Sequence, residues 1–281
     1  MNIIDAIINL VSNPVTELVE YYQGRNRANN AGDALEEYVK DLFAGTFDTD
    51  AEERNRIQSK VFSYFGNNSN PPDAMLKNGD AIEVKKIESD NSALALNSSY
   101  PKHKFCKDNP MISTACKSAE DWFEKDIIYI VGVIGKNTNR LKHIFMVYGT
   151  EYCASEECYK KIRRIIKNAV ESTEGIEFAD SKELGHINKV DPLGITYMRI
   201  RGMWGIENPW KVFSYIYQRD FSKTLNFACI ISNDKWNTFE NRNLLLDLSE
   251  QTESLNITDK QVKDPDNPAQ LIDVKLITFC I

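Results

Sequence analysis

The sequence predicts an α/β (α+β) fold in which a central mixed β-sheet is flanked by helices. Three observations carry this prediction. Residues 31–43 place apolar side chains at helical spacing, the turn dipeptide Asn78-Gly79 separates two short strand candidates at 73–77 and 80–87, and residues 126–134 form a nearly continuous apolar run. Such a run is typical of a strand that is covered on both faces. Helices and strands therefore alternate along the chain, as expected for a sheet with helices packed against it.

The elements before the hairpin follow from apolar spacing and from loop residues. Residues 1–11 are apolar but are interrupted by Asp5, so we expect an amphipathic helix and neither a signal peptide nor a membrane span. An acidic loop is expected at 47–53 and an aromatic strand at 61–65. Gly, Asn and Pro cluster at 66–72, which predicts another loop.

The elements after the hairpin are a helix at 111–125, the buried strand, a second strand at 143–148 and a long helix at 156–171. The pattern changes near residue 180, and residues 185–210 are rich in Gly, Pro, Asn, Arg and aromatic residues. Two further strands are expected at 226–231 and 272–280, with loops between them. Because no flexible linker marks a boundary, we expect one domain over 1–281, with 180–281 as an elaboration that is not separable.

Composition and charge leave the class of partner open. The chain has 281 residues, 42% hydrophobic and 27% charged, which suits a globular protein with a sizeable core. The net charge of −7 does not exclude a nucleic acid, because a positive field can be local and a divalent metal needs clustered carboxylates. Residues 159–167 are strongly basic, but on their own they are better explained as a solvated helix. Six cysteines without a zinc spacing indicate reduced thiols and a cytoplasmic location, with no membrane.

Two acids and a lysine around the predicted hairpin carry the chemistry. In a strand, Glu83 and Lys85 project to one face while Val84 points to the other. The turn folds Asp73 back to their level, but a strict two-residue turn would pair Asp73 with Val84 and aim it at the wrong face. We therefore expect a three-residue loop, a bulge or a bend at Asp73. A structural hairpin remains an alternative to a catalytic one.

These residue types suit phosphate chemistry with a divalent metal. Asp73 and Glu83 offer the hard oxygen ligands that Mg²⁺ prefers, and the metal can neutralise a phosphate and activate a water. Lys85 would orient or deprotonate that water, or stabilise the developing charge, and the pattern does not choose among these roles. A third acid, Glu36 on the helix at 31–43, could point to the same metal.

The arrangement Pro72-Asp73 … Glu83-Val84-Lys85 resembles the PD-(D/E)xK nuclease motif, and Gly32 to Val39 resembles the acidic first helix of that superfamily. More specifically, the chain resembles the NgoPII-like type II restriction endonucleases. The resembling stretches are 26–43, 66–89, 93–102, 126–133 and 191–210.

The resemblance implies a restriction-endonuclease-like core with a catalytic part at 26–171 and a DNA-recognition elaboration at 180–281. It further implies a homodimer that cuts both strands of double-stranded DNA with Mg²⁺ at a short palindrome, with GGCC as the suggested target. Two alternatives stay open: another PD-(D/E)xK nuclease, such as a repair or mobile-element enzyme, and a DNA-binding module without cleavage.

Candidate base-reading residues lie in the predicted strand at 195–203. Arg199 and Arg201 would share one face of it, and arginine donates bidentately to guanine O6 and N7. A pair of surface arginines bridged to acids is the alternative. Asn188 and Asp191 are further candidates, for example for contacts to cytosine N4.

A polar segment after the predicted catalytic strand could contact phosphates. Asn97, Ser98, Ser99 and Lys102 offer amide, hydroxyl and ammonium donors, although an ordinary polar turn explains them as well. Trp204, Trp210 and His186 are expected to have structural roles more often than DNA-binding ones.

Overall fold

The computed structural model describes residues 1–23, 30–67, 70–136, 139–181 and 184–281. Its helices are α1 (Ile3–Ser12), α2 (Leu18–Gln23), α3 (Ala31–Ala44), α4 (Ala51–Val61), α5 (Thr114–Ser118), α6 (Gly149–Tyr152), α7 (Glu156–Glu171), α8 (Pro209–Val212), α9 (Asn233–Asn237) and α10 (Arg242–Gln251). Its strands are β1 (Phe62–Asn67), β2 (Asn70–Leu76), β3 (Ala81–Ile87), β4 (Leu94–Asn97), β5 (Phe105–Cys106), β6 (Glu124–Lys125), β7 (Ile127–Ile134), β8 (Leu141–Tyr148), β9 (Glu177–Ala179), β10 (Gly185–Asn188), β11 (Met198–Ile200), β12 (Trp204–Ile206), β13 (Asn226–Ser232), β14 (Leu255–Lys263) and β15 (Leu271–Cys280).

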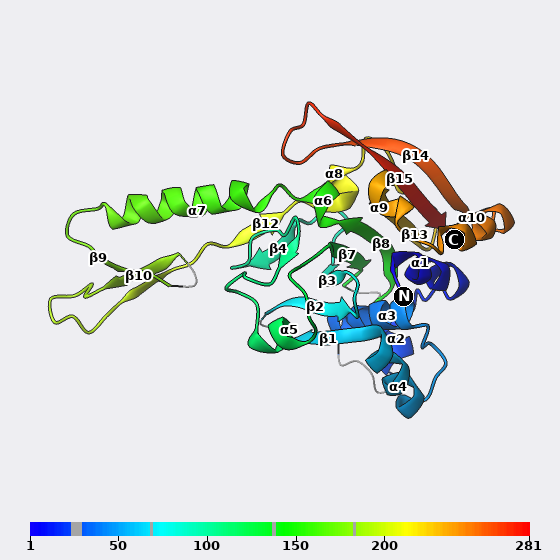
Figure 1. Ribbon diagram of the computed structural model, residues 1–281, viewed down its shortest axis with the longest axis horizontal. Coiled ribbons are helices and arrows are strands. Elements are labelled where there is room, and N and C mark those ends of the chain that lie inside the picture. Colours follow the sequence, from blue (N-terminus) through cyan, green and yellow to red (C-terminus); the bar gives the residue numbers. More distant parts are fainter. Residues whose placement is uncertain (24–29, 68–69, 137–138, 182–183) are drawn as a thin grey trace.

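Eight strands of the described chain form one mixed sheet in the order β1-β2-β3-β7-β8-β13-β15-β14 (Figure 1). The pairs β3–β7 and β8–β13 are parallel, and the other neighbours are antiparallel. Strand β7 lies near the middle and all of its residues are buried, as its apolar run predicted. The predicted α/β fold with a mixed sheet flanked by helices is therefore confirmed.

The sheet separates two hydrophobic clusters, and strand alternation decides which residue joins which. Ile82 and Val84 of β3 pack with the helices α1 and α3, whereas Ala81 and Ile87 belong to the cluster on the opposite face. Helix α3 buries every apolar residue predicted to share a face, namely Leu35, Tyr38, Val39, Leu42 and Phe43. The same alternation sends the side chains of Glu83 and Lys85 away from α3's cluster.

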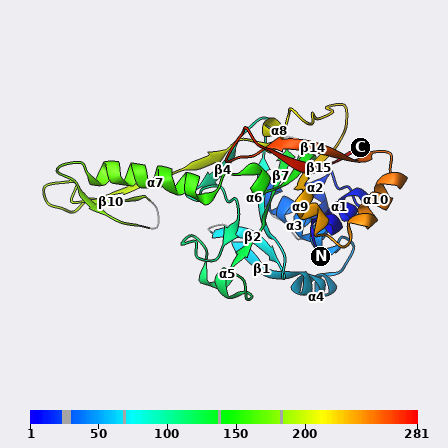
Figure 2. The ribbon, with the colours of Figure 1, turned by 45° about the horizontal axis from the view of Figure 1, so that its top comes forward.

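An arm made of α7 and the three-stranded sheet β9-β10-β11 extends from this body, as two views agree (Figures 1 and 2). Helix α7 has the predicted bounds, but none of its residues is buried. It packs on β9 of the arm sheet, and near its start Tyr159 contacts Tyr100 and Trp204. The chain returns to the body through β12, which pairs with β4 beside the central sheet. Two segments of the chain therefore join the arm to the body, one leading into α7 and one leading into β12.

The last part of the chain divides between arm and sheet. Residues 185–200 run through the arm, while the predicted strands near 226–231 and 272–280 are present as β13 and β15 and enter the central sheet. Between them lie α9, α10 and β14, in place of the loops that the sequence predicts. Helix α7 falls within the catalytic part expected at 26–171, and in the structure it lies in the arm (Figure 1).

Four other predicted segments differ from the structure. The helix at 111–125 is wrong, because only α5 is helical there; the indole of Trp122 donates to the carbonyl of Cys116 (3.2 Å), and residues 124–125 pair as β6. The loop at 47–53 ends early, because Asp50 caps α4 and the following acids suit a helix N-terminus.

The other two differences concern strands. The loop at 66–72 is mostly strand, since β1 reaches Asn67 and β2 starts at Asn70; residues 68–69 lie outside the described part. The strand at 195–203 is confined to β11, so Arg201 lies beyond its end. The six cysteines are free thiols. None of the described helices combines the length and the apolar character needed to cross a bilayer.

Candidate active site

The β2–β3 hairpin has the odd loop that the motif requires. Ala74 pairs with Ile82 and Met75 with Ala81, and the amide of Leu76 donates to the carbonyl of Asp80 (2.9 Å). Three residues, 77–79, are left in the loop, with Asn78 in the left-handed region at φ 55°. The predicted three-residue loop is confirmed. If the pairing of Ala74 with Ile82 is extended by one residue pair, Asp73 lies opposite Glu83.

Asp73 and Glu83 lie on the same face of the sheet. Met75, two residues from Asp73, and Ala81, two residues from Glu83, both belong to the cluster away from α3. The amide of Val84 donates to Asp73 Oδ2 (2.6 Å), so this carboxylate takes the place of a strand carbonyl where the β2–β3 ladder ends. The acids therefore meet as the motif requires, and Asp73 is held by the backbone of β3 itself.

Glu83 and Lys85 form a partly buried ion pair. Lys85 Nζ lies 2.6 Å from Glu83 Oε1, with the two side chains 25% and 13% exposed. Burial alone would lower the pKa of Lys85, but Glu83 and Asp73 outweigh burial and raise it. Burial, followed by the negative charge of Glu83, raises the pKa of Asp73 to about 7. The site thus crowds two acids together and holds one lysine protonated beside them.

One cavity of about 430 Å³ collects these groups. Glu36 on α3 also lines it, and burial raises the pKa of Glu36 while Lys85 opposes the shift. The polar turn at the end of β4 contributes Asn97, Ser98 and Ser99. The structure therefore brings together, around one cavity, the three motif residues, the additional acid and three of the four residues of the polar segment.

The acids fit a divalent cation. Glu83 Oε2 is buried, and no described residue donates a hydrogen bond to it, so it is an acceptor without a partner inside the cavity. No three His, Cys, Asp or Glu side chains among the described residues form a ready-made metal cluster. Mg²⁺ does not need one, because it usually binds one or two carboxylates and completes its shell with waters and phosphate oxygens.

Sequence comparison identifies the family to which this arrangement belongs. Residues 1–263 match the NgoPII restriction endonuclease family. This chain belongs to that family. The type II restriction enzyme NgoPII of Neisseria gonorrhoeae is 61% identical to it over 279 residues, which cover 99% of each chain. No solved structure matches the endonuclease. The expected family, the restriction-endonuclease-like fold and the enzyme class are therefore confirmed.

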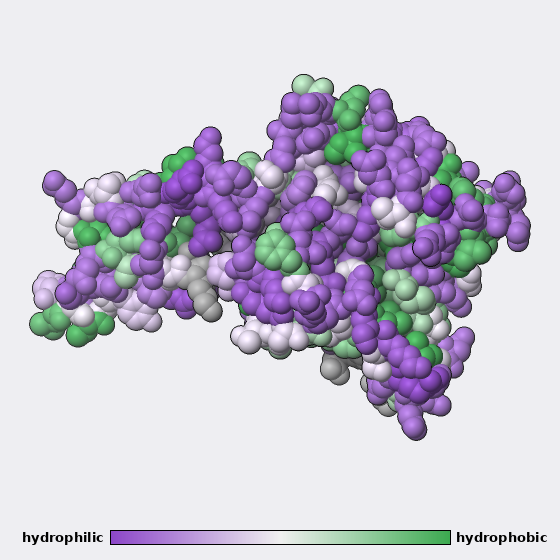
Figure 3. Space-filling view, viewed as in Figure 1, coloured by the Kyte–Doolittle hydropathy of each residue, from purple (hydrophilic) through white to green (hydrophobic). Residues whose placement is uncertain are grey.

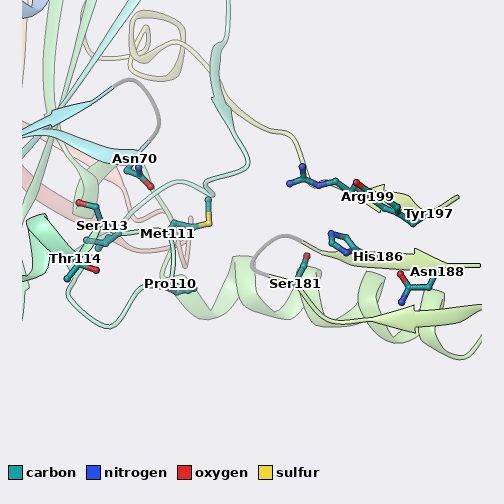
Figure 4. Close-up of a pocket in the computed structure, with 11 residues that line it drawn as sticks. Asn70, Pro110, Met111, Ser113, Thr114, Ser181, His186, Asn188, Tyr197 and Arg199 are labelled. Atoms are coloured by element: carbon teal, nitrogen blue, oxygen red, sulfur yellow. The ribbon is translucent and has the colours of Figure 1, made fainter. Parts of the chain in front are cut away.

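A second and larger cavity of the endonuclease, about 770 Å³, lies between the arm and the body. Figure 4 shows its two sides: His186, Asn188, Tyr197 and Arg199 come from the arm and face Asn70, Met111 and Ser113 of the body. Asn70 and Met111 line both cavities, so the arm cleft adjoins the acidic one. The candidate base-reading residues Asn188 and Arg199 thus line a cavity that adjoins the one with the candidate catalytic residues.

Arg199 and Arg201 do not work as a same-face pair on one strand. Arg199 lines the arm cleft, whereas Arg201, beyond the end of β11, lines the acidic cavity with Asp73 and Glu83. The two arginines therefore line different cavities.

Two other candidates have side chains committed to the protein. Asp191 accepts hydrogen bonds from the amides of Leu193 (3.0 Å) and Thr196 (2.6 Å), so it builds the turn at the tip of the arm. Lys102 is 5% exposed, and its ammonium group donates to Ser99 Oγ (3.0 Å) and to the carbonyl of Tyr100 (2.8 Å). Lys102 therefore supports the polar turn from within.

The sequence does not predict the body side of the cleft. Residues 110–113 line it and Met111 reaches both cavities, whereas the predicted helix at 111–125 covers residues 111–113. The Asn109-Pro110 dipeptide, a turn signal, could have revealed an irregular segment. Of the three aromatic candidates, Trp210 is buried and Trp204 packs on Tyr100 and Tyr159, as expected for structural roles. His186 instead lines the cleft.

Proposed function

We propose that this endonuclease hydrolyses phosphodiester bonds of double-stranded DNA in a Mg²⁺-dependent reaction, as a homodimer, at a short palindrome with the sequence GGCC. The observation that carries the proposal is the shared cavity of Asp73, Glu83 and Lys85 beside a cleft lined by hydrogen-bonding side chains. A duplex lying in the cleft would bring its backbone to the acids and its base edges to the arm.

Asp73 and Glu83 are the residues that would hold Mg²⁺, and Glu36 lies at the same cavity. When bound, the ion supplies neutralisation of the phosphate charge and an activated water. The unpartnered Glu83 Oε2 supports this assignment, because a buried anionic oxygen without a donor is costly unless a ligand satisfies it.

Lys85 acts as a charged donor in this proposal. Its pKa is raised, so it keeps its proton and can donate hydrogen bonds to a phosphate oxygen or to the attacking water. Glu83 Oε1, 2.6 Å away, fixes the direction of the ammonium group. The raised pKa therefore favours stabilisation of charge and orientation of water over the role of a base.

Reading of the target is assigned to the arm side of the cleft. Arg199 suits guanine through its two parallel donors, and Asn188 offers an amide that can both donate and accept. The target GGCC itself rests on the resemblance of the chain to its family and on the fit of arginine to a G-rich half-site.

A homodimer follows from the symmetry of a palindrome, because cutting both strands requires two copies of the cavity. The arm carries exposed apolar side chains that support contact with another protein surface. Ile162, Ile165 and Ile166 lie on α7, and Leu193 and Ile195 form part of a hydrophobic patch at the arm's tip (Figure 3). The free cysteines support a cytoplasmic location, where thiols stay reduced.

Digestion of a DNA library with and without Mg²⁺ tests the proposal. Sequencing of the ends should return one palindrome, and chelation by EDTA should stop cleavage. Random ends would support a nuclease of another type on the same fold, and absence of cleavage on every substrate would leave only a binding module. Light scattering should give the mass of two chains; a monomer at the concentrations used for cleavage would contradict the homodimer.

A further inference from the structure

Arg201 has a position that its assignment as a base reader does not explain. Strand β11 of the arm ends at Ile200, and three residues after Arg201 the chain enters β12. Trp204 of β12 pairs with Asn97 of β4, whose end lines the acidic cavity. This pairing holds the segment that returns from the arm against the rim of the acidic cavity. Arg201 lies in that segment and lines the cavity.

The charges around the acidic cavity leave a role for a second cation. Of the described residues that line it, Glu36, Asp73 and Glu83 are acids, while Lys85 and Arg201 are the cations. Lys85 is held by Glu83 at 2.6 Å. Lys102, although close in sequence, donates to Ser99 and Tyr100 and does not line the cavity. Arg201 is therefore the cation at this cavity that the arm, and not the catalytic hairpin, supplies.

We propose that Arg201 is a catalytic residue that binds the non-bridging oxygens of the scissile phosphate and stabilises the charge that develops there. This inference rests on the proposed nuclease function. A guanidinium group matches two phosphate oxygens with parallel donors, and it stays protonated at any working pH.

The charge change during hydrolysis explains why such a group helps. The oxygen of water forms a bond to phosphorus and gives up one proton to solvent, the bond from phosphorus to the leaving sugar oxygen breaks, and that oxygen takes up a proton from solvent. Negative charge grows on the non-bridging oxygens before the bond breaks. Arg201 transfers no proton, and its donors strengthen as that charge grows.

The position of Arg201 also connects recognition to cleavage. Arg199 lines the arm cleft and Arg201 the acidic cavity, although only Ile200 separates them. In extended chain, residues two apart lie roughly 7 Å from each other. A segment that seats Arg199 correctly on its base therefore also delivers Arg201 to the phosphate, whereas a wrong base would displace both.

Single-turnover cleavage by Arg201→Ala, with Lys189→Ala as the matched control, tests the proposal. Both variants remove an exposed cation of the arm, but Lys189 lines neither cavity, so general loss of charge affects them alike. Arg201→Ala should cleave the target roughly 100-fold more slowly or worse. It should bind the target in Ca²⁺ less than about tenfold more weakly and keep the preference for target over non-target DNA.

Rescue of the cleavage rate by added guanidinium ion distinguishes a chemical role of Arg201 from a merely structural one. The ion should restore part of the cleavage rate of Arg201→Ala and none of that of Asp73→Ala. Arg201→Lys, which keeps the charge but loses the fork, should cleave faster than Arg201→Ala and more slowly than the native enzyme. A native cleavage rate in Arg201→Ala, or a lost target preference without rescue, would overturn the proposal. If the native enzyme cleaves no DNA at all, the proposed function itself fails.

Discussion

Replacement of Lys85 by methionine should destabilise the metal-free protein as well as stop its activity. The two acids beside Lys85 are close and partly buried, with Glu83 Oε1 2.6 Å from Nζ and only 13% of the Glu83 side chain exposed. Methionine fills similar space but leaves Glu83 and Asp73 without their nearest cation. The structure therefore predicts a cost to folding that has its origin in the catalytic site.

The size of the destabilisation in Lys85→Met follows from the burial of the Glu83–Lys85 ion pair. Removal of one partner from a fully buried ion pair costs about 3–5 kcal/mol, and the 25% exposure of Lys85 places this case at the lower end, at about 3 kcal/mol. Glu83→Gln alone should cost less than about 1 kcal/mol, because it also relieves the repulsion that raises the pKa of Asp73. The double variant should be close to Glu83→Gln in stability, because the two changes remove a whole pair.

Urea unfolding in EDTA at pH 8, followed by tryptophan fluorescence, measures the cycle. The coupling between the two substitutions should be about 2–3 kcal/mol. The exposed pair Arg56–Glu53 serves as the control, and its cycle should be additive. Additive effects at Glu83 and Lys85 would refute the described ion pair. A folded Lys85→Met variant with full activity would instead refute the role of the lysine.

Three further outcomes are expected. Asp73→Ala should abolish cleavage while target binding in Ca²⁺ persists in a gel-shift assay; loss of both, together with loss of folding, would point to a structural hairpin. Arg199→Ala should cost about 1–3 kcal/mol of discrimination against altered targets, and an unchanged specificity ratio would remove it from base reading. Burial raises the pKa of Glu151 from 4.5 to about 7, so the folded protein holds a proton that the unfolded chain releases and stability falls as pH rises through this range. Glu151→Gln should abolish this fall of about 3 kcal/mol between pH 4.5 and 8, measured by urea unfolding; an equal fall in both proteins would contradict it.

The body of the protein could be predicted because its sequence patterns report local geometry. Helix α3 and strand β7 bury the faces that their apolar spacing indicates, and α7 has its predicted bounds. The alternation of side chains along a strand restricts the β2–β3 connection to a few geometries, because a strict two-residue turn would place Asp73 and Glu83 on opposite faces. Such arguments work when the residues that must meet are close in sequence.

The arm could not be predicted in the same way. Leu193, Ile195 and Tyr197 have the apolar character of strand residues in a core, yet they are 83%, 76% and 64% exposed. Hydrophobicity indicates that a residue favours an apolar neighbour, but it does not say whether that neighbour belongs to the same chain. For an arm that protrudes from the body, the sequence therefore predicts strands and leaves their surroundings open.

The division of labour between Arg199 and Arg201 is a further consequence of long-range structure. Periodicity places two residues of a strand on one face, and it would hold here if β11 continued past Ile200. The strand ends because the chain must reach β4, where Trp204 pairs with Asn97. That pairing joins segments about a hundred residues apart and brings Arg201 to the cavity that the acids line. The residue that follows the end of β11 is therefore the one that we propose binds the phosphate.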